Sequence, residues 1–134
     1  MSQIIEGRKV MKGRAEGEAL VSSDGISFYG GVEPETGIVV EKGHPLEGQC
    51  ITGKVLVFPT GKGSTVGSYA LYQMKKLGKA PIAIINKEIE TIVAVGAIIS
   101  EIPCVDKIDI EKIKNGIKIT VEADEGKVII EGSE

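Results

Sequence analysis

The chain has 134 residues, 42% of them hydrophobic and 26% charged, which suits one globular domain with a buried core. The net charge is −3, from 16 Lys and Arg against 19 Asp and Glu, and the two signs are mixed without the basic stripe that nucleic acid requires. One His and two Cys do not suffice for a structural zinc site, or for the three or four thiolates that usually hold an iron–sulfur cluster.

The composition also bears on the compartment. The amino-terminal stretch lacks the apolar block of a secretory signal, and the longest apolar run, residues 91–99, is too short to cross a bilayer. We therefore expect a cytoplasmic protein in which Cys50 and Cys104 are free thiols.

The first third of the chain shows no helical period. Apolar residues separated by charged or glycine positions over residues 2–23 predict two strands on either side of Gly13. Residues 24–50 are rich in Gly and Pro, with short extended pieces expected at 26–29 and 37–40. A long irregular segment of this kind in a compact domain is often functional.

The middle of the chain alternates strands with helices. Residues 51–58 and 80–86 are apolar runs that predict buried strands. Between them, residues 65–77 predict a helix that ends at Gly78, because its apolar residues recur on one face. That face is expected to consist of Val66, Ala70, Met74 and Leu77.

The last third continues this alternation and then changes to a hairpin. A short helix is expected over residues 91–98 and a strand over 102–105, followed by two alternating strands around the turn at 124–126. Strands, a glycine-rich segment, alternating strands and helices, and a terminal hairpin indicate a mixed α/β fold. This order fits neither a pure sandwich nor a doubly wound sheet.

The loop PTGKGSTVG, between the predicted strand and the first predicted helix, attracts attention but matches no common motif. Lys62 is followed by Gly63, so it is not a phosphate-binding P-loop, and Val66 stands where the dinucleotide fingerprint needs glycine. Ser64 directly follows Gly63, which excludes the nucleophile elbow of hydrolases.

Three interpretations of this loop remain open on local sequence. The amide groups of a helix start could bind an anion close to Lys62. Alternatively, Ser64 or Thr65 could simply cap the helix while the glycines make the turn. The bare backbone at Gly61, Gly63 and Gly67, on every side of one serine, favours close approach of a ligand.

Other constellations are weaker. Ser64 could act as a nucleophile with His44 and an acid such as Asp106, but a single histidine in HPLEG is more often a turn residue. A thiol protease built from Cys50 and His44 is weaker still. The loop FYGGVEPETG could be an ordinary surface loop. The residues alone thus indicate one anion-and-hydroxyl site and no particular reaction.

Four stretches in one order carry a specific resemblance. They are ISFYGGVEPETGIV, HPLEGQCITGKVLVFPTGKGSTVGSYAL, APIAIIN and VAVGAIISEIPCV. Together they resemble the small subunit of the aconitase X family, from about Gly13 to the final hairpin. Several motifs in one order are far more specific than a single glycine loop.

The resemblance implies a fold and a partner. The fold would be mixed α/β, the β/β/α barrel-like swivelling domain of aconitases, with residues 1–134 forming a single swivelling domain. The chain would be half of a heterodimeric hydro-lyase, active only with a large subunit that carries a [4Fe–4S] cluster, while this chain binds no cofactor or metal. Archaeal members of the family dehydrate (R)-5-phosphomevalonate to trans-anhydromevalonate 5-phosphate in isoprenoid synthesis.

The resemblance also implies site residues. Ser64 stands at the family's serine, which accepts the proton, and Lys62, Gly63 and Thr65 surround it as expected contacts of a phosphorylated hydroxy acid. Gly30 and Gly31 are expected near the substrate.

The chain departs from the family pattern in one place and leaves the substrate open. Arginine is usual where Lys62 stands, and lysine cannot bind a carboxylate or phosphate through two parallel hydrogen bonds. Relatives act on other hydroxy acids, such as cis-3-hydroxyproline and aconitate-like compounds. A non-catalytic module for anion binding or assembly is a further alternative.

Overall fold

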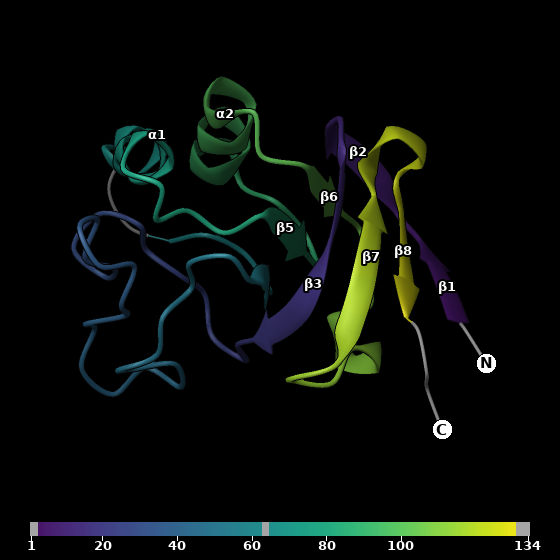
Figure 1. Ribbon diagram of the computed structural model, residues 1–134, viewed down its shortest axis with the longest axis horizontal. Coiled ribbons are helices and arrows are strands. Elements are labelled where there is room, and N and C mark those ends of the chain that lie inside the picture. The colour runs from purple at the N-terminus through teal and green to yellow at the C-terminus, as the bar shows by residue number, and fades with distance from the viewer. Residues whose placement is uncertain (1–2, 63–64, 131–134) are drawn as a thin grey trace.

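The computed structural model describes residues 3–62 and 65–130 (Figure 1). Its framework is an eight-stranded sheet with the strand order β1-β8-β7-β3-β4-β5-β6-β2. The strands are β1 (Gln3–Glu6), β2 (Arg8–Met11), β3 (Arg14–Val21), β4 (Val55–Phe58), β5 (Ala83–Asn86), β6 (Cys104–Asp106), β7 (Lys118–Glu122) and β8 (Lys127–Ile130).

The sheet has a parallel half and an antiparallel half. Strands β3, β4, β5 and β6 are parallel neighbours, whereas β7, β8 and β1 extend the sheet antiparallel from β3, and β2 pairs antiparallel with β6. Parallel neighbours need crossover connections. Helix-containing segments connect β4 to β5 and β5 to β6, whereas the irregular segment of residues 22–54 connects β3 to β4. The mixed α/β class expected from the sequence is therefore confirmed.

The sheet curves because its two end strands are consecutive in the chain. Only Gly7 separates β1 from β2, and its amide donates a hydrogen bond to the carbonyl of Gly126. A side chain at Gly7 would collide with the carbonyl oxygen of Asp106 and with Ile108. Gly7 thus allows the chain to pass from one end of the sheet to the other and close it.

Both faces of the central strands are buried. Along β4, Leu56 and Phe58 pack in one hydrophobic cluster, while Val55 and Val57 belong to a second. The second cluster consists mainly of strand residues. The first also includes residues of the two helices and of the long irregular segment. Burial on both faces explains why this strand reads as a continuous apolar run.

Two helices lie side by side over the parallel half of the sheet (Figure 1). They are α1 (Gly67–Lys76) and α2 (Thr91–Ser100). A side chain at Gly96 of α2 would meet Leu71 and the backbone of Ser68, so this glycine permits the close packing of the pair. The Ser68 hydroxyl donates to the carbonyl of Ile92 and joins the two helices.

Both predicted helices exist, but the predicted face of α1 is partly wrong. Ala70 and Met74 are buried as expected, together with Leu71. Val66 and Leu77 are 43% and 47% exposed, because the helix is shorter than predicted and both residues flank it. None of the helices in the described part of the chain is long and apolar enough to span a membrane.

The strand predictions are correct in place and less accurate in their ends. The terminal hairpin is confirmed, with a short 3₁₀ turn, Ala123–Glu125, between β7 and β8. A second 3₁₀ turn, Ile110–Lys112, follows β6. The predicted pair of strands around Gly13 is instead three strands, because Gly7 divides the first. Cys50 and Cys104 are free thiols, the former exposed and the latter buried.

The long segment before β4 is irregular, as its composition predicts. Isolated bridges join Val32 to Val39 and Ile38 to Cys50, and these replace the extended pieces expected there. The segment contributes several buried residues to the first hydrophobic cluster, namely Ile26, Phe28, Val32, Val39, Leu46 and Ile51. It is therefore a packed part of the domain, which holds its polar residues in defined positions.

Candidate active site

Two glycine-rich segments that are distant in sequence meet next to α1. Ile26 forms a parallel bridge with Gly61, and backbone hydrogen bonds run from the Lys62 amide to the Ile26 carbonyl (3.1 Å) and from the Ile26 amide to the Thr60 carbonyl (3.3 Å). The start of the loop after β4 is also held by β5, because the buried side-chain amide of Asn86 donates a hydrogen bond to the Phe58 carbonyl at 2.9 Å. These contacts bring residues 60–62 beside the FYGG stretch.

A pocket of about 360 Å³ opens where the two segments meet. Three of the predicted substrate contacts, Lys62, Gly30 and Gly31, line it together. Thr65 is exposed but does not line this pocket. Gly63 and Ser64 lie outside the described residues. The other lining residues are Ser27, Tyr29 and Glu41.

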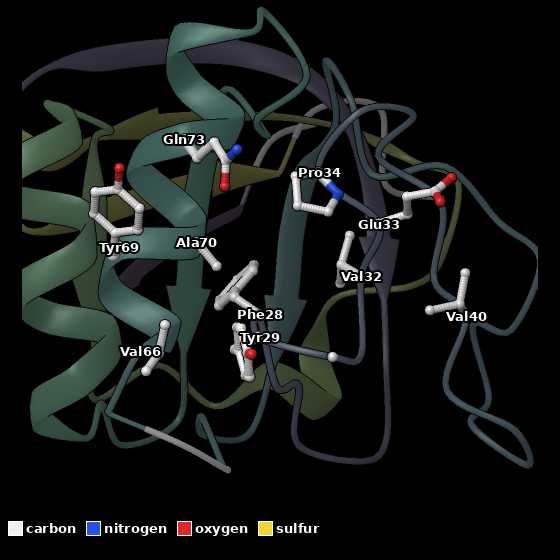
Figure 2. Close-up of a pocket in the computed structure, with 11 residues that line it drawn as sticks. Phe28, Tyr29, Val32, Glu33, Pro34, Val40, Val66, Tyr69, Ala70 and Gln73 are labelled. Carbon is white, nitrogen blue, oxygen red and sulfur yellow. The ribbon is translucent and has the colours of Figure 1, made fainter.

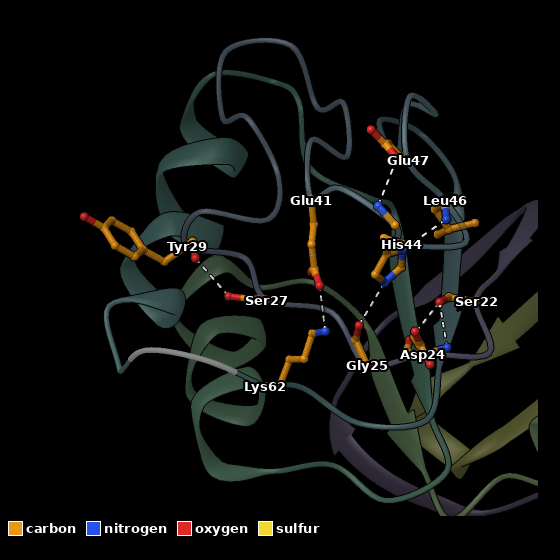
Figure 3. Close-up of polar contacts among 11 residues, drawn as sticks. Ser22, Asp24, Gly25, Ser27, Tyr29, Glu41, His44, Leu46, Glu47 and Lys62 are labelled. Atoms are coloured by element: carbon orange, nitrogen blue, oxygen red, sulfur yellow. Dashed lines mark hydrogen bonds and ion pairs between the residues drawn. The ribbon is translucent and has the colours of Figure 1, made fainter.

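The charge of Lys62 is paired with a residue that sequence reasoning missed (Figure 3). Lys62 Nζ lies 2.8 Å from Glu41 Oε2, and both side chains are partly exposed. The hydrogen bond to Glu41 raises the pKa of Lys62, so this side chain is a cation throughout the neutral range. An ammonium has three donors, and Glu41 engages one of them. The others can bind an oxygen of a ligand in the pocket.

The backbone of the FYGG stretch is held by its own contacts. Gly30 has a φ of +89°, a conformation that favours glycine, and an added side chain there would meet open space. At Gly31 an added side chain would collide with the carbonyl of Ser27. The Ser27 hydroxyl donates to the carbonyl of Tyr29 at 2.9 Å and closes this turn.

Two of the loop glycines are explained by packing. A side chain at Gly61 would collide with Val93 and with Glu90, and one at Gly67 would press on Ile92. Glu90 caps α2, since its carboxylate accepts from the amides of Ile92 and Val93. Close approach to α2 therefore requires Gly61 and favours Gly67, and neither glycine needs a ligand to explain it.

The capping interpretation of the loop fails for Thr65. Helix α1 begins at Gly67, and its N-cap residue is Val66, whose side chain makes no capping hydrogen bond. Thr65 precedes the N-cap position. The last turn carries Lys75 and Lys76, whose charge suits the negative end of the helix dipole.

The contacts of His44 contradict the serine hydrolase and thiol protease alternatives (Figure 3). The Leu46 amide donates to His44 Nδ1 at 3.0 Å, so Nε2 carries the proton and donates to the Gly25 carbonyl at 2.9 Å. Both ring nitrogens are occupied by backbone groups, and neither can activate a serine or a thiol. The Cys50 thiol itself donates to the Thr36 carbonyl.

Asp106 has a structural partner instead of a catalytic one. Its carboxylate is fully buried and accepts two hydrogen bonds from Arg8, at 2.9 and 2.8 Å, and one from the Ile89 amide at 3.0 Å. These contacts join β2 to β6 at the closure of the sheet. The contacts of His44 and Asp106 therefore contradict the alternative triad with Ser64, which the sequence already disfavoured.

The local sequence explains why Glu41 and Tyr29 escaped prediction. Both lie in the irregular segment, where no period of apolar residues defines which side chains point inward. Their approach to Lys62 depends on the bridge between Ile26 and Gly61, and no local sequence pattern predicts that pairing. The glycine and proline content of the segment was the available signal.

Known proteins are similar to this chain over nearly its whole length. The aconitase X swivel domain model matches residues 4–130. The phosphomevalonate dehydratase small subunit of Thermococcus kodakarensis is 59% identical over 126 residues, 94% of this chain and 95% of that protein. The protein of the same name from Methanosarcina acetivorans is 59% identical over 127 residues, 92% of this chain and 88% of that protein.

A solved structure is similar over the same length. The crystal structure of Thermococcus kodakaraensis aconitase X in its holo-form superposes with a TM-score of 0.94 at 58% sequence identity, covering 96% of this chain and 98% of that chain. The two folds therefore agree through the irregular segment as well as through the sheet.

Proposed function

Because this chain belongs to the aconitase X swivel domain family, we propose that it is the small subunit of a two-chain phosphomevalonate dehydratase, a hydro-lyase. The observation that carries the proposal is the 59% identity to the Thermococcus kodakarensis small subunit over nearly the whole of both chains. The pocket that joins Lys62 to Gly30 and Gly31 supports it, because a cation next to exposed backbone suits an anionic substrate.

The reaction removes water from (R)-5-phosphomevalonate and gives trans-anhydromevalonate 5-phosphate. A proton leaves the carbon beside the one that carries the hydroxyl group, and the hydroxyl group leaves as water. This chain then has two tasks: to hold an anionic substrate and to accept the proton.

Lys62 performs the first task. It is a cation at neutral pH, and the donors that Glu41 does not engage can bind a carboxylate or phosphate oxygen of the substrate. Gly30 and Gly31 belong to the wall of the same pocket and leave room for the substrate to approach the backbone.

Ser64 is the proton acceptor. A serine hydroxyl is a weak acid, so its alkoxide needs stabilisation by nearby positive charge. Helix α1 begins at Gly67, shortly after Ser64 in the chain, and the positive end of its dipole favours negative charge there. Lys62, two residues before Ser64, adds a positive charge to the same loop, which its ion pair with Glu41 offsets in part.

The iron–sulfur cluster belongs to the large subunit. Within residues 3–62 and 65–130, no three side chains of His, Cys, Asp or Glu gather in a group that could hold a metal ion. Cys104 is buried in the hydrophobic core and Cys50 is exposed, so the two thiols do not form a cradle for a cluster. The donor set of this chain does not fit a [4Fe–4S] cluster, which supports an obligatory partner.

The test compares three versions of the complete enzyme. This chain is co-expressed with the large subunit, the cluster is reconstituted without oxygen, and the loss of 5-phosphomevalonate is followed for wild type, Ser64→Ala and Ser23→Ala. Ser23 is exposed and does not line the Lys62 pocket, so its substitution is the matched control.

We expect Ser64→Ala to lower kcat by about 10²–10⁴-fold, the usual contribution of a general base, while Ser23→Ala behaves as wild type. Undiminished turnover by Ser64→Ala would assign this chain to binding or assembly. A cluster-bearing complex that leaves 5-phosphomevalonate unchanged would retain the family and require another hydroxy acid as substrate.

A further inference from the structure

An apolar groove lies beside the candidate site, between α1 and the segment that follows Phe28 (Figure 2). Its volume is about 440 Å³. Among its lining residues Glu33 alone is charged, and the walls are formed mainly by Phe28, Val32, Pro34, Val40, Val66 and Ala70.

The groove exposes side chains that usually become buried. Tyr69 on α1 is 64% exposed, Tyr29 is 57% exposed and Val40 is 47% exposed. Figure 2 shows Tyr29 and Val66 close to the start of α1, with Val40 on the opposite wall. Tyrosines and aliphatic residues gathered around a hollow are typical of protein–protein interfaces, in which tyrosine is enriched among the few residues that dominate the affinity.

The groove adjoins the Lys62 pocket. Tyr29 and Gly30 line both cavities, so they form a shared wall. In the proposed enzyme the large subunit must cover the Lys62 pocket, because the substrate has to contact both chains. A surface that closes over this pocket necessarily reaches Tyr29 and the near end of the groove.

We propose that the groove receives an apolar segment of the large subunit, which makes it the docking site of the heterodimer. This inference rests on the proposed function, since that function requires the partner. The low charge of the groove indicates the chemistry of the segment: aliphatic or aromatic side chains, with polar groups restricted to the end near Glu33.

A second copy of this chain is a less suitable occupant. A copy seated in the groove would also cover Tyr29 and Gly30, and would block the Lys62 pocket that the large subunit and the substrate must reach. Docking of the large subunit in the groove and catalysis in the adjacent pocket are compatible with each other.

The test measures pairing and turnover separately. Tagged wild-type chain is bound to the large subunit, and untagged variants compete with it for the complex. The groove variants are Tyr69→Ala and Val40→Glu. The matched control is Ile4→Glu, because Ile4 is an apolar residue with 54% exposure on strand β1, at the far end of the molecule from α1 (Figure 1).

We expect each groove variant to compete about tenfold or more weakly than wild type, whereas Ile4→Glu competes equally well. Turnover should be low for the groove variants at limiting concentration and return to the wild-type kcat when the variant chain is in excess. Recovery of the wild-type kcat with the variant chain in excess shows that the substitution impairs docking and not catalysis.

Two outcomes overturn the proposal. Groove variants that compete as well as Ile4→Glu place the docking surface elsewhere. Self-association of the wild-type chain that Tyr69→Ala abolishes, with pairing to the large subunit unaffected, assigns the groove to a second copy. The proposed function fails independently: Ser64→Ala that pairs normally and turns over normally refutes the catalytic role and leaves the docking site intact.

Discussion

At the scale of single residues, the Lys62–Glu41 pair determines the charge of the candidate site. Both side chains are partly exposed, and an ion pair of this kind contributes little to stability because water screens it. The same lysine is well placed for a ligand, since Glu41 raises its pKa and leaves donors unused. We therefore propose that Lys62 acts mainly in substrate binding.

Lys62→Met should weaken substrate binding and leave the fold intact. Loss of a charge-assisted hydrogen bond is expected to raise KM by roughly tenfold to a hundredfold, and the free energy of unfolding should change by no more than about 1 kcal/mol. Steady-state kinetics and thermal unfolding of the assembled enzyme measure the two effects. Lys42→Met is the control, because Lys42 adjoins Glu41 in sequence but does not line the pocket. An unchanged KM would remove Lys62 from the binding site.

At the scale of elements, the closure of the sheet depends on a buried carboxylate. Asp106 on β6 is fully buried and is held by Arg8 on β2, whose own side chain is 59% exposed. Arg14 on β3 forms a similar pair with Glu122 on β7, and its side chain is 60% exposed, but the partner carboxylate is 29% exposed. The two arginines thus differ in the burial of the carboxylate that each one neutralises, and in that Arg8 donates two hydrogen bonds whereas Arg14 donates one.

Arg8→Ala should destabilise the protein clearly more than Arg14→Ala. The first substitution leaves a buried charge without its counter-ion, whereas the second leaves a carboxylate that water can reach. Urea unfolding of both variants, followed by circular dichroism, gives the two changes in the free energy of unfolding. Equal effects would mean that water reaches Asp106 once Arg8 is removed.

At the scale of the whole molecule, one buried thiol couples stability to pH. Cys104 lies in the hydrophobic cluster beneath the helices, and burial, followed by the charge of Asp106, raises its pKa far above the ordinary value of 9.0. The folded protein keeps the thiol protonated at alkaline pH, whereas the unfolded chain releases the proton. Stability from this group is complete below pH 9 and decreases as the pH rises further.

We expect the free energy of unfolding to fall above pH 9 by about 1.4 kcal/mol per pH unit from this single proton. Cys104→Ala should lose some stability at neutral pH, through the small cavity that it leaves, and should show a correspondingly flatter alkaline decrease. Denaturant titrations at several alkaline pH values measure the slope. Cys50→Ala is the control, because Cys50 is exposed in the fold. Identical slopes for wild type and Cys104→Ala would refute the coupling.

The elements that the sequence predicted well are those with strong local signals. The terminal hairpin follows from a glycine turn between alternating strands. Helix α2 had the weaker signal, because its continuous apolar run is compatible with a buried strand as well as a helix. The face of α1 was partly mistaken because Val66 and Leu77 continue its apolar pattern beyond the ends of the helix. Helix ends depend on backbone geometry, which an apolar period does not contain.

The sequence by itself determined the mixed α/β class, the family and the Lys62 loop, because each depends on the order of residues along the chain. Only the tertiary structure decided that Gly7 closes the sheet, that Glu41 pairs with Lys62, and that His44 is bound to backbone groups on both nitrogens. Most of these contacts join residues far apart in the chain. Such contacts form when the sheet curves and the irregular segment packs against it, so they cannot be predicted from a pattern of neighbouring residues.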